Sequence, residues 1–169
     1  MEAHHAISHL DDLELAILVC LIAGDHCIIR TPKHLLDRVQ KEVEDSAANV
    51  FGLTAKTVQY GTSDDDQVLA DALSNQVKPE SNPSGNTLLV QVNVIIARHL
   101  NQAPHRVQLE ALDLMRSKKL MSYNKALVLP NPFLFVSLLS DDAYGPPLFT
   151  PHLVRIQFCF LDANELTIR

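Results

Sequence analysis

The stretch from Thr87 to Ala97 is dominated by apolar and β-branched residues and shows no helical periodicity. Such a run predicts one strand buried on both faces, as in a parallel sheet, or a strand interrupted by a turn. A similar run from Phe133 to Leu139 predicts another buried strand. Shorter apolar runs predict three more strands, at residues 26–29, 57–60 and 156–161.

Segments in which apolar residues recur at helical spacing separate these runs. The first helix is expected to begin at a capping box, Ser8 and Asp11, and to end at Gly24. Thr31 is expected to cap the next helix, with Pro32 at its first position. Two further helices are expected at 69–73 and from 101 onward, with a hairpin at 118–129. Alternating strands and helices predict an α/β domain with a mainly parallel, five-stranded sheet between helices.

A single domain is expected to span residues 1–169, with a flexible N-terminus at 1–9 and a surface loop at 75–86. A chain of this length buries enough surface to fold without a disulfide or a structural metal. Its three cysteines stand in apolar runs without Cys-x-x-Cys spacing. This placement favours buried, reduced thiols in an intracellular protein.

Charge and hydropathy argue against two classes of partner. The formal charge of -6 disfavours broad nucleic-acid binding. The longest apolar run, Leu15 to Gly24, is too short to span a bilayer, and the N-terminus lacks the basic region of a signal peptide. We therefore expect a cytoplasmic or nuclear protein without a membrane partner. No metal site is expected, because His5 and His9 lack further ligands and the acidic run 64–66 lacks the EF-hand pattern.

Ligands of parallel α/β sheets bind at the carboxyl ends of the strands. In this chain those ends are expected at Arg30–Thr31, Gly61, Arg98–His99 and Ser140. These residues are the first candidates for a functional site.

One segment, VIIARHLNQAPHRVQ at Val94 to Gln108, resembles the AAA+ ATPases of the magnesium chelatase and MoxR group, which carry a run like ILLADEINRAPPKVQ. A second segment, Leu21 to Ile29, is similar to the ALLAGGHVLL strand that precedes the phosphate loop in that group. The likeness extends over residues 13–161, including a hairpin before the fourth strand. It implies a P-loop NTPase core whose helical lid would follow Leu161, and this chain has no room for that lid.

The phosphate-binding chemistry of the family is not matched. Its loop has the pattern G-x-x-x-x-G-K-[ST], in which backbone N–H groups, a lysine and a hydroxyl hold phosphate and Mg²⁺. Here the segment is Thr31-Pro32-Lys33-His34, so that Lys33 falls on the family lysine and His34 on its Ser/Thr. The glycines are missing and Pro32 has no N–H group. Lys33 is then either a solvated lysine or a weak phosphate contact at a helix N-terminus.

The family's other functional positions have changed as well. Arg98 and His99 stand where the resemblance places an Asp-Glu pair that organises Mg²⁺ and water. A guanidinium cannot bind a cation, although His99 could act as a base near neutral pH. Ser140 falls on the polar sensor, and Arg155 falls on the arginine that acts across subunits in active relatives.

The sequence therefore predicts no catalytic residue, and favours a catalytically degenerate AAA+ core without a cofactor. Its expected role is a scaffold for a protein partner or for self-association. One alternative is an ATPase subunit of a magnesium-chelatase-like or MoxR-like complex, completed by a partner and using ATP and Mg²⁺. Another is a nonhydrolytic nucleotide or anion sensor that uses Lys33 and Arg98.

Overall fold

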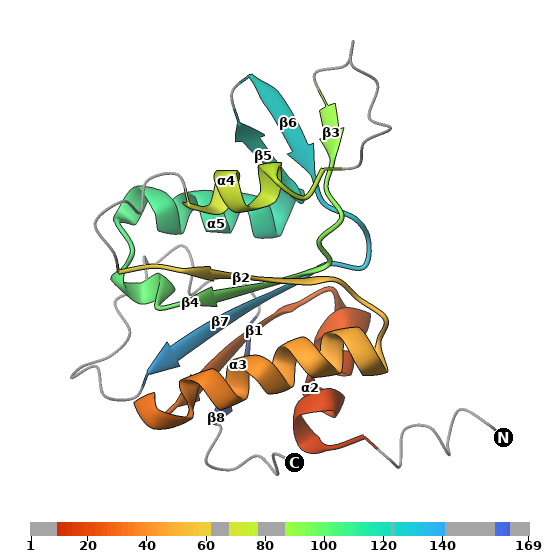
Figure 1. The fold of residues 1–169 in the computed structure, drawn as a ribbon, viewed down its shortest axis with the longest axis vertical. Helices are drawn as coiled ribbons and strands as arrows, with labels where there is room; N and C mark the ends of the chain where they lie inside the picture. Colours follow the sequence, from red (N-terminus) through yellow and green to blue (C-terminus); the bar gives the residue numbers. More distant parts are fainter. Residues whose placement is uncertain (1–9, 62–67, 78–86, 123, 141–157, 163–169) are drawn as a thin grey trace, which may run out of the picture.

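The computed structural model describes residues 10–61, 68–77, 87–122, 124–140 and 158–162 (Figure 1). Five strands form the main sheet in the order β2-β4-β7-β1-β8, and each neighbouring pair is parallel. The five strands are β1 His26–Thr31, β2 Ala55–Gln59, β4 Val94–Arg98, β7 Leu134–Ser140 and β8 Phe158–Asp162. The predicted α/β class with a mainly parallel five-stranded sheet is confirmed.

Helices cover both faces of this sheet (Figure 1). The helices are α2 Asp12–Ala23, α3 Leu36–Asp45, α4 Val68–Ser74 and α5 His105–Ser117. Buried side chains of α2 and α3 pack on one face, and those of α4 and α5 pack on the other, so the sheet separates two apolar clusters. Both faces of β4 and β7 are buried, which explains why their sequences are continuous apolar runs.

The Thr87 to Ala97 run contains a turn, the second of the two structures expected for it. Its first part is β3, Thr87–Leu89, which lies in a separate three-stranded sheet of order β3-β6-β5. The predicted hairpin supplies the other two strands, β5 Lys119–Ser122 and β6 Lys125–Val128. Within the turn, the Asn93 side chain donates a hydrogen bond of 2.9 Å to the carbonyl of Pro132.

Two predicted helix caps were wrong. Helix α2 is capped by Asp11, which forms a reciprocal capping box with Glu14, whereas Ser8 lies outside the described residues. Thr31 is the last residue of β1, paired with Ser140 of β7, because the parallel ladder extends through it. Pro32 then precedes a short 3-10 turn, Lys33–Leu35, that leads into α3. The predicted end of α2 is confirmed, since Gly24 has the left-handed φ of 73°.

The remaining connections are two short helical turns: a π turn at Ser46–Val50 and a 3-10 turn at Leu100–Gln102. The expected N-terminal segment 1–9 and most of the expected loop 75–86 lie outside the described residues. Among the helices that the structure describes, none is long and apolar enough to cross a membrane.

A buried histidine joins the main sheet to α5. His26 Nδ1 accepts a hydrogen bond of 3.2 Å from the Phe135 N–H group, so its other ring nitrogen carries the proton. That nitrogen, Nε2, lies 3.3 Å from the carbonyl of Met115 at the end of α5. The ring also makes edge contacts with Phe133 and Phe135. Burial lowers the pKa of His26, which keeps the imidazole neutral in this arrangement.

Candidate functional site

The carboxyl ends of β1, β4 and β7 form one edge of the main sheet. Thr31 is paired with Ser140, and Arg98 with Leu138, so the predicted residues at these strand ends are neighbours. Lys33 lies close enough to His99 to influence its charge. The structure therefore brings Thr31, Lys33, Arg98, His99 and Ser140 to one edge. Arg155 lies outside the described residues.

Arg98 connects the end of β4 to α3. Its Nη1 atom donates hydrogen bonds of 2.8 Å to Asp37 Oδ1 and 2.8 Å to Gln40 Oε1. The Arg98 side chain is 16% exposed, whereas that of Asp37 is 89% exposed. The guanidinium is thus held between strand and helix, with its charge balanced by a carboxylate on the solvent side.

This contact belongs to a chain of polar groups that crosses from β4 to β2. Gln40 donates through Nε2 to Glu44 Oε1 at 2.9 Å, and Thr57 Oγ1 donates to the same oxygen. The chain therefore links Arg98 of β4, two side chains of α3, and Thr57 of β2. It fixes α3 over β2 and β4, while the adjacent face of α3, which carries Leu36 and Val43, packs in the core.

His99 has an unusual backbone conformation at this edge. Its φ of 57° is left-handed, a region in which histidine is more common than most residues, and its N–H group bonds to the Leu138 carbonyl at 3.1 Å. Nδ1 is buried without a hydrogen-bond partner among the described residues. Burial, and then the positive charges of Arg98 and Lys33, lower the pKa of His99. The imidazole is therefore neutral at pH 7 and adds no charge to the edge.

In the turn after β1, two backbone N–H groups form hydrogen bonds within the chain and cannot donate to a phosphate. The N–H group of Leu35 donates to the Pro32 carbonyl at 2.9 Å, and that of Leu36 donates to the Lys33 carbonyl. Pro32 has no N–H group. Lys33 and His34 are exposed, in keeping with a solvated lysine. The segment forms a closed 3-10 turn instead of a loop with converging N–H groups.

The residues at this edge do not fit Mg²⁺ and a nucleotide triphosphate. Arg98 is a cation and cannot bind a metal ion, and Asp37, the acidic side chain bonded to it, is already engaged by the guanidinium. No group of three or more His, Cys, Asp or Glu side chains that could hold a metal is found in the described part of the chain. The arrangement is an ion pair at the end of β4 that holds this strand against α3.

Sequence reasoning did not identify Asp37, Gln40, Glu44 or Thr57 as members of this network. The first three are spaced three and four residues apart along α3, so they share one polar face. That spacing was a usable signal for a polar stripe. The identity of its partner, a strand residue 61 positions away from Asp37, has no local signal.

No family model and no curated protein matches this chain. Among 47 matching chains of solved structures is one from Cytophaga hutchinsonii, which is provisionally named an ATPase. It shares 18% sequence identity with a TM-score of 0.58 and aligns with 89% of this chain. This chain spans 44% of the length of that protein. The similarity is one of fold, and it agrees with an α/β core in which a parallel sheet lies between helices.

Proposed function

We propose that this chain is a catalytically degenerate AAA+-like domain that acts as a scaffold for protein interaction or assembly. The observation that carries the proposal is the bridge from Arg98 to Asp37 and Gln40. A fixed guanidinium at the end of β4 opposes a metal ion at the position where the family resemblance requires a carboxylate.

A second change supports the same conclusion at the end of β1. In the short turn at Lys33–Leu35, the N–H groups of Leu35 and Leu36 bond to the carbonyls of Pro32 and Lys33, as described above. Loss of one preorganised electrostatic donor costs an enzyme about 3 kcal/mol of transition-state stabilisation. Loss of both the phosphate cradle and the metal site would reduce a hydrolysis rate by more than about 10⁴-fold.

The residues that match the resembled family, such as Gln108, Ala103 and Val107, have structural roles in this chain. Gln108 is buried, and its Nε2 atom donates a hydrogen bond of 3.0 Å to the Ala103 carbonyl across the start of α5. Ala103 and Val107 belong to the core cluster on the α5 side of the sheet. Retention of structural positions beside altered chemical ones favours selection for the fold over selection for ATP hydrolysis.

One observation favours a nonhydrolytic anion sensor as the second candidate. The charges of Lys33 and Arg98 both act on His99, so two cationic side chains converge at this edge. Asp37 already balances Arg98, which leaves Lys33 as the main attraction for an anion there. An ATPase completed by a partner has no such observation in its favour and becomes an outcome of the test.

The test is thermal unfolding of the chain with and without millimolar ATP, in Mg²⁺ and in EDTA. A ligand at about 100 times its dissociation constant adds roughly 2.7 kcal/mol, which corresponds to about 5 to 10 °C in Tm for a chain of this size. The scaffold proposal predicts an unchanged Tm in both buffers. A rise only with Mg²⁺ would support the ATPase alternative, and a rise that persists in EDTA would support the anion sensor.

Sedimentation velocity over a range of protein concentrations separates the two forms of scaffold. Self-association predicts a sedimentation coefficient that rises with concentration in the absence of nucleotide. A constant monomeric value assigns the scaffold role to a different protein partner. A species that assembles only with ATP would contradict the proposal.

A further inference from the structure

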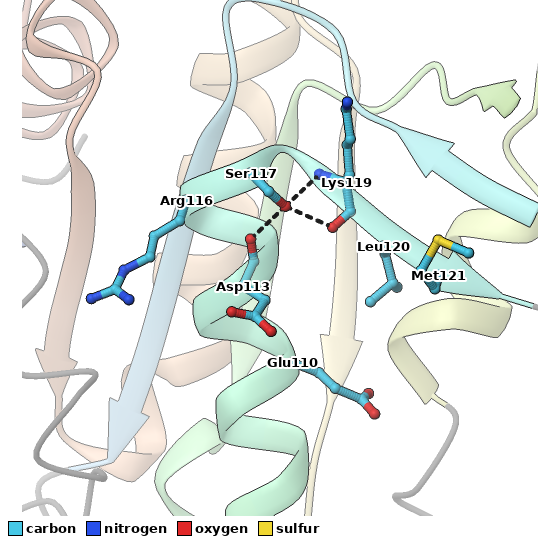
Figure 2. Close-up of a pocket in the computed structure, with 7 residues that line it drawn as sticks. All are labelled: Glu110, Asp113, Arg116, Ser117, Lys119, Leu120 and Met121. Carbon is cyan, nitrogen blue, oxygen red and sulfur yellow. Dashed lines mark hydrogen bonds between the residues drawn. The ribbon is translucent and has the colours of Figure 1, made fainter.

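A hollow of about 530 Å³ lies between α5 and β5, apart from the edge described above. Its lining comes from the second half of α5 and from successive residues of β5 (Figure 2): Glu110, Asp113, Arg116, Ser117, Lys119, Leu120 and Met121. Arg98 lies before the N-terminus of α5, whereas Ser117 is the last residue of that helix. At 1.5 Å per residue, the length of α5 separates the two regions by roughly 18 Å.

Strand β5 is an edge strand of the small sheet, since its described partner is β6 alone. The Val128 carbonyl of β6 bonds to the Val90 N–H group, so the backbone polar groups of Val128 point away from β5. Lys119 lies opposite Val128, and in an antiparallel pair its N–H and C=O groups must then point to the open edge. The Ser117 hydroxyl bonds to both groups: it accepts from the Lys119 N–H group at 3.1 Å and donates to the Lys119 carbonyl at 3.0 Å (Figure 2).

Met121 follows two residues later and therefore turns its N–H and C=O groups to the same open edge. The alternation of burial along β5 places Leu120 in the core and Met121 on the outer surface. The Met121 side chain is 69% exposed, which makes it one of the most exposed large apolar residues in the described structure. Backbone groups at an open edge beside an exposed methionine form a template for another strand.

The α5 side of the hollow carries two carboxylates and one guanidinium, Glu110, Asp113 and Arg116. Figure 2 shows the Glu110 and Asp113 carboxylates beside β5, whereas the Arg116 guanidinium points to the opposite side of α5. Glu110 also pairs with Arg106 at 3.3 Å, an exposed contact on the same helix. The Lys119 ammonium extends beyond the end of the helix (Figure 2). A segment that lies along β5 would therefore meet carboxylates on its helix-facing side.

We propose that this hollow binds an extended segment of a partner protein, which adds as a strand to β5 beside Met121. In a strand, alternate side chains point to opposite faces. The partner segment would direct Lys or Arg side chains toward Glu110 and Asp113, and apolar side chains outward beside Met121. An extended backbone can pair with the Met121 N–H and C=O groups together, whereas the backbone groups within a helix are already bonded to each other, which favours a strand over a helix as the occupant.

A second copy of this chain fits the hollow less well than a basic segment. Two-fold pairing through β5 would place the same surface of both copies face to face. The Glu110 and Asp113 carboxylates of one copy would then meet those of the other, which is unfavourable. The inference rests on the interaction role in the proposed function, but it uses none of the residues at the Arg98 edge.

The experiment measures binding of a labelled, capped peptide of alternating lysine and valine by fluorescence anisotropy, with an alternating glutamate and valine peptide in parallel. Met121→Pro removes the outward N–H group and Met121→Ala retains it. Loss of one hydrogen bond is expected to weaken binding of the lysine peptide to Met121→Pro by about twofold to tenfold relative to Met121→Ala. Circular dichroism and thermal unfolding confirm that both variants fold.

The double variant Glu110→Gln, Asp113→Asn is expected to weaken binding of the lysine peptide by about twofold to tenfold at low salt. Asp45→Asn, an exposed carboxylate on α3 at the other face of the sheet, is the matched control and should leave binding unchanged. Equal affinity for the two peptides, equal affinity of the two Met121 variants, or absence of binding would overturn the proposal. A dimer that Met121→Pro dissociates would overturn it in favour of a second copy. None of these outcomes alters the nucleotide test, so the two proposals fail independently.

Discussion

The Arg98 guanidinium and the Asp37 carboxylate are 2.8 Å apart, and they join the end of β4 to the helix that follows β1. These are the two elements between which an ATPase of the resembled family would hold its phosphates and metal. In this chain the space is crossed by an ion pair, and a second bond from Arg98 to Gln40 extends it along α3. Under the proposed function, this contact has a structural role and not a catalytic one.

Arg98→Ala is predicted to lower the free energy of unfolding by about 1 to 2 kcal/mol, because it removes two hydrogen bonds from a largely buried guanidinium. Asp37→Asn keeps an oxygen for Nη1 and should cost less than about 1 kcal/mol, since Asp37 is 89% exposed. Arg106→Ala removes an exposed arginine with a carboxylate partner and serves as control, within about 0.5 kcal/mol of wild type. Urea unfolding measures all three. An Arg98 variant as stable as the Arg106 variant would refute a structural role for the bridge.

His26 is predicted to make stability fall as the pH is lowered. Its folded pKa is below the ordinary value of 6.5, chiefly because of burial, and the Met115 hydrogen bond only partly opposes this shift. Below pH 6.5 the unfolded chain takes up a proton that the folded chain does not, so stability is lost until the folded pKa is reached. His99 contributes with the same sign.

The variant that tests His26 is His26→Gln. Glutamine does not titrate and offers the Phe135 N–H group no equivalent of Nδ1, so it should lower stability at pH 7.5 by about 1 to 3 kcal/mol. The difference between wild type and the variant should narrow as the pH falls from about 7.5 to 5, because only wild type loses the His26 contribution. A constant difference across that range would mean that His26 does not titrate as described.

The left-handed backbone at His99 predicts a specific order of tolerated residues. Asparagine adopts a positive φ readily, so His99→Asn should remain within about 0.5 kcal/mol of wild type. His99→Val places a β-branched residue at φ 57° and should cost about 1 to 2 kcal/mol. Thermal unfolding distinguishes them. The opposite order would show that the His99 side chain, and not its backbone, matters to stability.

Gln108 is predicted to act through the Ala103 carbonyl. Gln108→Met has similar length but no donor, and leaves a buried carbonyl without this partner at a cost of about 1 to 3 kcal/mol. Gln102, on the neighbouring 3-10 turn, is exposed and provides the control as Gln102→Met. Equal stability of the two variants would show that the Gln108 hydrogen bond to Ala103 does not stabilise the fold.

Local patterns predicted most of the elements of the fold, since helical spacing marked the helices and continuous apolar runs such as Leu134–Ser140 marked the buried strands. The capping rule failed at Thr31 because pairing with Ser140 in the sheet overrides a local preference for capping. Periodicity could not divide the Thr87–Ala97 run, because strands of two different sheets share the same apolar character. The partners of Arg98 were also unpredictable, since a contact over 61 residues depends on where α3 lies.

The central claim of the proposed function is that this chain does not bind the nucleotide that the strand ends of the resembled family hold. Isothermal titration of the purified chain with Mg²⁺-ATP tests it directly. The closed turn at Lys33–Leu35 and the Arg98–Asp37 bridge predict no saturable heat up to millimolar nucleotide. Saturable binding that is lost in EDTA would contradict the degenerate-core interpretation.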